Sequence, residues 1–166
     1  MVSAELARGV ARRIHGGQLT RLGEPVIEHV ERVAGAVPAE ARALAYLHDV
    51  LERADAGGEE LLELGLSDDE RSVLALLTRR PDEPYRAHVM DIARAEGTIG
   101  RLARTIKAAD LDDHLRQRQV AAGAPCYAWA REKIAAYQRA NGEAVIAGSA
   151  AAETVAEARG RCMLGD

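Results

Sequence analysis

Hydrophobic residues recur at spacings of three and four along most of the chain, which predicts a protein built from amphipathic helices. The first helix is expected from Ser3 to about Gly16, and Ser3 is suited to cap its first turn. Its apolar positions are Ala4, Ala7, Val10, Ala11 and Ile14. The glycine pair that follows, Gly16 and Gly17, is typical of a helix end.

The same periodicity predicts seven further helices. Their expected ranges are 25–36, 38–51, 67–80, 85–96, 98–118, 125–140 and 143–159. Pro25 and Pro38 stand at helix starts, where a missing backbone N–H costs nothing. Ser67 with Glu70 three residues later forms a capping-box pattern. The expected connections are short, including a loop over residues 54–58, so a compact helical bundle follows.

Composition supports helices over strands. The chain has 166 residues, of which 48% are hydrophobic and only 3% aromatic, with no Phe. Ala, Leu and Val must therefore fill the interior, whereas sheets draw on β-branched and aromatic residues. The length suits one domain, which we predict to span residues 1–166.

Charge and cysteine usage restrict the partners and the compartment. The net charge of −4 offers no general attraction for nucleic acid or an anionic membrane surface. No run of about 18 apolar residues is present, so no transmembrane helix is expected. Cys126 and Cys162 fit neither a disulfide framework nor a metal motif, and we expect reduced thiols in a cytoplasmic protein.

Three charged or titratable residues interrupt apolar helical segments. His48 and Asp49 are adjacent within Leu44–Leu51, and Asp110 lies within Ile106–Leu111. Burying such groups is costly unless they are paired or bind a metal. A divalent cation shared with His29 would explain them together, although single histidines of this kind are more often ordinary core or surface residues.

The ligand types narrow the choice of ion. A mixed set of imidazoles and carboxylates suits Mn, Fe, Zn, Co or Ni better than Ca or Mg. Adjacent helical residues point about 100° apart. His48 and Asp49 could therefore bind one ion only if the ion lay between their two directions, at a helix junction.

Four ordered blocks extend this pattern. They are His15–Val30, Leu47–Glu52, Leu76–Arg79 and Ile106–Leu111. Together they resemble the HD-domain metal-dependent phosphohydrolases, and most closely the RelA/SpoT-type hydrolase domain, which includes small stand-alone enzymes that remove the 3′-pyrophosphate of (p)ppGpp. The resemblance covers about residues 2–115. It implies an all-α, single-domain orthogonal helical bundle of the HD-domain type, which helices over about 116–166 would complete.

The resemblance also implies a set of site residues. Its metal ligands fall on His29, His48, Asp49 and Asp110, around one divalent metal for which Mn²⁺ is the first choice and Fe²⁺, Zn²⁺, Co²⁺ or Ni²⁺ are alternatives. Its catalytic acid falls on Glu52. That residue follows Asp49 by three positions and His48 by four, so it projects from the same side of the helix toward the metal. A solvated glutamate near a helix end is the alternative.

Several positions depart from the family pattern. Arg53 follows Glu52 where the family has an acidic residue, so turnover could be slow or the substrate different. Arg53 could instead bind a phosphate, with an ordinary surface salt bridge as the alternative. The basic residue that stacks on guanine falls on Thr20, with its partner on Arg21, and Val26 replaces the usual Tyr. A guanidinium can stack on a purine, so Arg21 is the remaining candidate for the base.

Two residues near Asp110 complete the predicted substrate site. Lys107 shares a helix face with Asp110 and is a candidate phosphate contact, with an ordinary surface lysine as the alternative. His114 occupies a family position that contacts the ribose, although Asp113 and His114 replace the family's His-Asn pair.

The resemblance implies a hydrolase of a nucleotide phosphate or pyrophosphate ester, with ppGpp-like alarmones as the leading substrates. Another phosphorylated nucleotide, such as NADPH or a nucleoside monophosphate, is an alternative. A third possibility is a weakly catalytic, metal-binding nucleotide sensor, because Arg53 replaces the acidic residue that follows the catalytic glutamate in the family. A homodimer through the Ala-rich tail is compatible with the sequence.

Overall fold

The computed structural model describes residues 2–20, 22–53, 61, 63–117 and 124–145, and every regular element within these ranges is a helix. The helices are α1 (Ala4–Ile14), α2 (Val26–Ala36), α3 (Ala39–Leu47), α4 (Val50–Arg53), α6 (Asp68–Leu77), α7 (Tyr85–Arg94), α8 (Gly97–Arg116) and α9 (Ala124–Ala140). The predicted all-α class is confirmed for this part of the chain.

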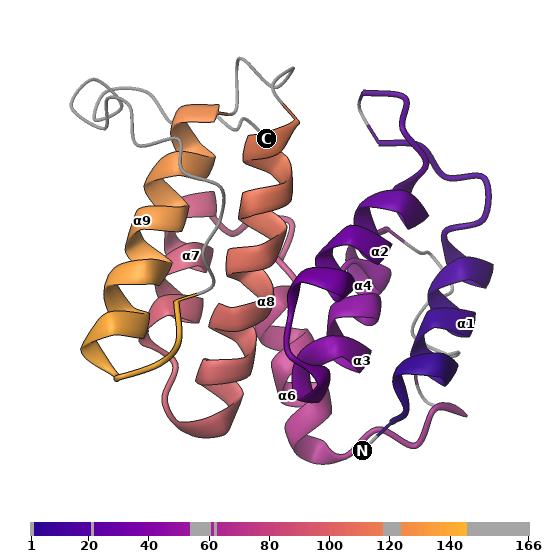
Figure 1. Ribbon diagram of the computed structural model, residues 1–166, viewed down its shortest axis with the longest axis horizontal. Helices are drawn as coiled ribbons and strands as arrows, with labels where there is room; N and C mark the ends of the chain where they lie inside the picture. Colours follow the sequence, from indigo (N-terminus) through magenta and orange to yellow (C-terminus); the bar gives the residue numbers. More distant parts are fainter. Residues whose placement is uncertain (1, 21, 54–60, 62, 118–123, 146–166) are drawn as a thin grey trace.

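Helix α8 lies at the centre of the molecule (Figure 1). Helices α7 and α9 lie on one side of it, and α1 to α4 lie on the other, with α6 below them in the same view. Helix α8 contacts α2, α3, α6, α7 and α9. A buried side chain on α8 can therefore contact residues of α2 and α3 on one side of the molecule or of α7 and α9 on the other.

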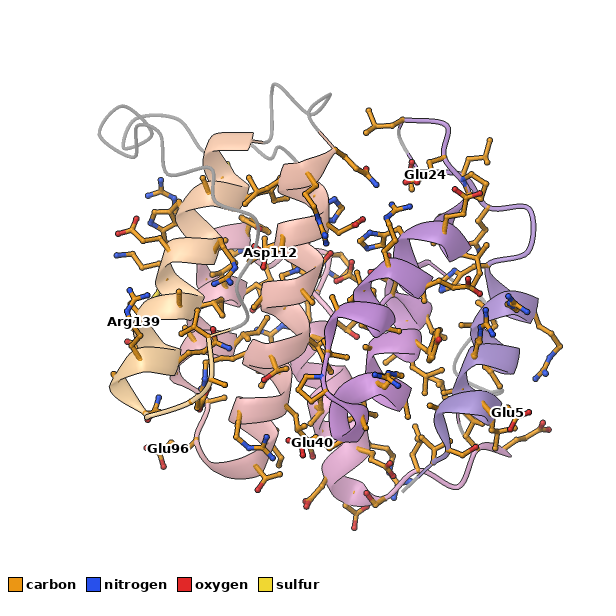
Figure 2. All side chains as sticks on the ribbon, viewed as in Figure 1. Glu5, Glu24, Glu40, Glu96, Asp112 and Arg139 are labelled. Atoms are coloured by element: carbon orange, nitrogen blue, oxygen red, sulfur yellow. The ribbon has the colours of Figure 1, made fainter. Side chains whose placement is uncertain are left out.

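Small side chains allow this close packing. The central part of α8 buries Ala103, Ala108 and Ala109 beside Ile106 and Leu111. The main core continues through leucines and valines of α3 and α6, including Leu44, Leu47, Val73 and Leu74. Charged residues such as Glu5, Glu40, Glu96 and Arg139 lie at the periphery (Figure 2). The expected core of Ala, Leu and Val is confirmed.

Helix starts agree with the sequence signals. The Ser3 side chain accepts a hydrogen bond from the Leu6 N–H, and Ser67 and Glu70 form the predicted capping box. Several helices end earlier than predicted, and α6 stops at Leu77 instead of residue 80. Residues 143–145 are not helical. The rest of the predicted tail helix and the 54–58 loop lie outside the described residues.

The largest difference concerns the predicted helix over residues 38–51. The structure divides it into α3, which ends at Leu47, and the short α4, which begins at Val50. His48 and Asp49 form the turn between them. The apolar periodicity runs on through this turn, so the pattern alone cannot reveal it. The two residues thus occupy the helix junction that a shared ion requires.

Two other expectations concern cysteines and membranes. Cys126 is disulfide-bonded, so the prediction of a reduced thiol is wrong there, and this cysteine does not indicate a reducing compartment. Cys162 lies outside the described residues. Within the part of the chain that the structure describes, no helix combines the length and apolar character needed to cross a membrane.

Candidate metal centre

His29 is the buried histidine of α2, with 2% of its surface exposed. Its Nδ1 lies 2.8 Å from Asp113 Oδ2, which orients the ring and leaves Nε2 on the other side. Nε2 lies 3.3 Å from Asp110 Oδ1, and no hydrogen bond satisfies it among the described residues. This arrangement matches a metal-binding histidine, whose second nitrogen donates to a carboxylate.

His48 presents its Nε2 in the same way. The residue caps the C-terminus of α3, and its Nδ1 lies 2.7 Å from the Ala45 carbonyl oxygen. The carbonyl can only accept a hydrogen bond, so the proton of the neutral ring belongs on Nδ1. Nε2 carries the lone pair, is buried and makes no hydrogen bond in the described structure. It lies 3.3 Å from Asp49 Oδ1.

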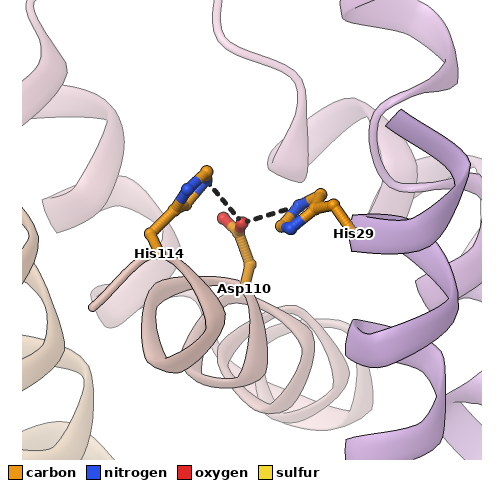
Figure 3. A group of neighbouring side chains, drawn as sticks. All are labelled: His29, Asp110 and His114. Carbon is orange, nitrogen blue, oxygen red and sulfur yellow. Dashed lines mark ion pairs between the residues drawn. The ribbon is translucent and has the colours of Figure 1, made fainter. Parts of the chain in front are cut away.

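Asp110 comes from the inner face of α8 and lies between two imidazoles (Figure 3). Its burial would raise the pKa of the carboxyl group, but the charge of Lys107 and contacts with His114 and His29 hold that pKa well below its usual range. Asp110 is therefore ionised, as a metal ligand must be.

The electrostatics of His29 depend on three carboxylates. Burial would lower the pKa of this imidazole, but contacts with Asp110 and Asp113 and the charge of Asp49 raise it to about 10. Without a metal, His29 thus holds protons on both nitrogens. A metal could bind His29 only after Nε2 releases its proton. The negative charge of the three surrounding carboxylates would then stabilise the divalent cation in place of that proton.

The predicted ligands meet at this point of the fold. Ligand atoms of His29, His48 and Asp49 all lie within 4.8 Å of one another. The ring centroids of His29 and His48 are 5.5 Å apart. Asp110 joins the group through its contact with His29. Two buried imidazole nitrogens without hydrogen bonds, beside two carboxylates, fit a divalent metal ion.

Lys107 contacts this group, and the charge of Glu52 acts on Lys107. The ammonium of Lys107 is 2.8 Å from Asp110 Oδ2. Its burial would lower the pKa, but the charges of Asp110 and Glu52 contribute to raising it, so the ammonium stays protonated. Glu52 is exposed, and its Oε1 accepts a hydrogen bond of 2.6 Å from the Arg79 N–H. Glu52 belongs to α4, so the assumption that one helix carries it with His48 is wrong.

Of the three remaining predicted site residues, the structure describes the side chain of only one. His114 lies on α8 with its Nε2 only 3.1 Å from Asp110 Oδ1. Arg53 ends α4, but its side chain is outside the described part of the structure. Arg21 also lies outside the described residues.

Sequence reasoning missed the group that supports His29. Arg32 Nε donates to Asp113 Oδ1 at 2.8 Å, and the same guanidinium donates twice to Glu24, at 2.6 and 2.9 Å. The Gln117 amide donates to Glu24 at 2.7 Å. These contacts join the segment before α2 to the end of α8. Glu24 with Arg32 eight residues later gives no helical-spacing signal, so only the folded arrangement reveals the group.

Comparison with known proteins adds no family assignment. No model of a protein family matches the chain, and no curated protein is significantly similar to it.

Proposed function

We propose that this protein is a metal-dependent phosphohydrolase of the HD-domain type, with one divalent ion held by His29, His48, Asp49 and Asp110. The main support is the pair of buried Nε2 atoms without hydrogen bonds, which face two carboxylates at the junction of α2, α3 and α8. A divalent ion bound there supplies an activated water near neutral pH and offsets negative charge on the attacked phosphorus.

Glu52 is the proposed proton acceptor. Its Oε1 accepts a hydrogen bond from the Arg79 N–H, which holds the carboxylate and leaves Oε2 to receive a proton. Its charge acts on Lys107, which itself contacts Asp110. A carboxylate beside the cationic side of the site suits general base catalysis, which contributes typically about 10²–10⁴-fold to rate.

Lys107 and Tyr85 are the proposed phosphate contacts. Lys107 is protonated and bonded to a metal ligand, so an incoming phosphate oxygen would find a cation beside the ion. The buried Tyr85 hydroxyl has no hydrogen-bond partner among the described residues. Its burial raises the pKa of Tyr85 to about 12, so the hydroxyl is a neutral donor. The two donors favour a phosphorylated substrate, for which ppGpp-like nucleotides are the first choice.

A metal-dependent nucleotide sensor is the second candidate. Arg53 is adjacent to Glu52 in the chain, and one carboxylate oxygen of Glu52 already accepts a hydrogen bond from a backbone N–H. Both features weaken proton transfer without weakening metal binding. The sensor would use the same ion and nucleotide but would release no product.

The experiment compares turnover across nucleotides and variants. Protein loaded with Mn²⁺ is incubated with ppGpp, NADPH and deoxynucleoside monophosphates, and phosphate or pyrophosphate release is measured. We expect hydrolysis of at least one nucleotide, a loss of at least about 100-fold in Glu52→Gln, and no turnover in His48→Ala. Glu40→Gln, which changes an exposed glutamate of α3, is the matched control and should keep the wild-type rate. Turnover that survives in His48→Ala would overturn the proposal.

A further variant separates the enzyme from the sensor. Restoring an acid with Arg53→Asp should increase alarmone hydrolysis if the basic residue limits proton transfer. Metal binding with nucleotide affinity but without turnover, in both wild type and Arg53→Asp, would favour the sensor.

A further inference from the structure

His114 lies beside Asp110 but is not one of the four proposed metal ligands. It follows Asp110 by four residues on α8, so the two side chains share a helix face. Its Nε2 lies 3.1 Å from Asp110 Oδ1, and His29 Nε2 lies 3.3 Å from the same oxygen. Figure 3 shows the carboxylate between the two rings. Two imidazole nitrogens thus converge on one carboxylate oxygen.

Neighbouring rings hold His114 in this orientation. One face of the ring stacks on His29, with centroids 4.9 Å apart and planes 26° apart. The His114 ring also stacks on the ring of Tyr127 in α9, with centroids 4.8 Å apart and planes 10° apart. The His114 side chain is 27% exposed, whereas those of His29 and His48 are 3% and 5% exposed. Its position is set by packing before any ligand arrives.

His114 forms a second ligand group with residues of the first. Ligand atoms of His29, Asp110 and His114 lie within 4.8 Å of one another, as do those of His29, His48 and Asp49. His29 belongs to both groups, and its Nδ1 is occupied by Asp113. One remaining nitrogen can bind only one ion. The two groups therefore describe a single metal site, which both of them surround.

We propose that His114 is a fifth protein ligand of this ion and not a contact to the substrate's sugar. This inference rests on the proposed metal site and extends it. Three imidazoles with two carboxylates shift preference from Mn²⁺ toward Fe²⁺, Co²⁺, Ni²⁺ and Zn²⁺, which favour nitrogen ligands more strongly. With five protein ligands the ion could still bind the water that the proposed hydrolysis requires.

The test measures metal binding without nucleotide. Affinities for Co²⁺, Ni²⁺ and Mn²⁺ are measured by titration in the wild type and in His114→Gln, with His88→Gln as the control for loss of a histidine outside the site. We expect His114→Gln to weaken Co²⁺ and Ni²⁺ binding by at least about tenfold, since even residues outside the ligand shell contribute that much. The Mn²⁺ affinity should fall less, and His88→Gln should bind like the wild type.

X-ray absorption of the Co²⁺-loaded protein counts the imidazoles directly. Three should bind the ion in the wild type and two in His114→Gln. Two imidazoles in both proteins, with unchanged affinities, would overturn the role of His114 and leave the four-ligand site intact. Failure of the wild type to bind any of the three metals would overturn the proposed function as well. Thermal unfolding of the metal-free variants shows whether they are folded.

Discussion

Asp113 determines how His29 presents its free nitrogen. The carboxylate is 1% exposed, lies 2.8 Å from His29 Nδ1 and accepts two hydrogen bonds from Arg32, at 2.8 and 3.0 Å. Burial would raise the pKa of Asp113, but its hydrogen bonds with His29 and Arg32 lower it, so it remains an anion. A fixed anion on Nδ1 keeps the Nδ1 proton in place and directs Nε2 toward the candidate metal site.

Replacing this anion should weaken metal binding. Asp113→Asn keeps the shape but can present an amide N–H to His29, so we expect metal affinity to fall by about 10–100-fold. Calorimetric titration checks this. Asp112→Asn is the matched control, because the neighbouring Asp112 pairs with Arg131 instead. Equal affinities in the two variants would contradict the role of Asp113.

His88 should make the stability of the fold depend on pH. Its burial and the charge of Lys107 lower the pKa of this histidine to about 4, although Glu83 acts in the other direction and Arg79 adds to the lowering. Between about pH 6.5 and 4 the unfolded chain then binds more protons than the folded one, so stability falls as the pH falls. We expect the free energy of unfolding to drop by about 2 kcal/mol more in the wild type than in His88→Gln between pH 7.5 and 5. Denaturant unfolding at the two pH values measures it, and parallel losses would refute the assignment.

At this scale the sequence reveals some residues and hides others. His48, Asp49 and Asp110 are visible because they interrupt apolar helical segments, where a charge needs a partner. Asp113 gives no such signal, because it stands between Asp112 and His114 near the C-terminal end of α8, where an aspartate looks like an exposed residue. Its burial arises from α2 packing against α8.

At the scale of elements, the junction between α3 and α4 matters most. Residues 38–51 contain no glycine or internal proline that would signal a break, and their apolar spacing continues across it. Capping and proline positions identified most helix starts, because those signals are local. No local signal marks the break at His48 and Asp49, where these two adjacent candidate ligands lie 3.3 Å apart.

The contact between α7 and α8 gives a prediction for Gly100. A Cβ at this position would lie 1.9 Å from the Ala95 carbonyl oxygen at the end of α7, so the two helices would have to move apart. We expect Gly100→Ala to destabilise the protein by roughly 1–3 kcal/mol. Gly9→Ala in α1 meets no atom within 4 Å and should stabilise by about 0.5–1 kcal/mol. Denaturant unfolding compares the two, and equal effects would contradict the packing.

At the scale of the whole molecule, the proposed ion joins segments far apart in the chain. Its ligands come from α2, from the α3–α4 junction and from α8, which itself contacts most of the other helices. The predicted helical architecture follows from periodicity over the whole chain. The convergence of these three segments does not, because it depends on how the helices pack.

Binding at this junction should therefore stabilise the fold. A ligand that binds only the folded state at 100 times its dissociation constant contributes about 2.7 kcal/mol. For a chain of this size we expect that to raise the Tm by roughly 5–10 °C. Calorimetry with and without metal measures the shift, and His48→Ala should show little of it.

The most direct test is the metal content of the purified protein after loading and removal of excess ions. Elemental analysis of the wild type should give about one divalent ion per chain, because His29 offers a single free nitrogen to both ligand groups. His48→Ala, analysed in parallel and shown to be folded, should retain little or none. A wild type that holds no ion, or a His48→Ala variant that holds as much as the wild type, would contradict the metal centre.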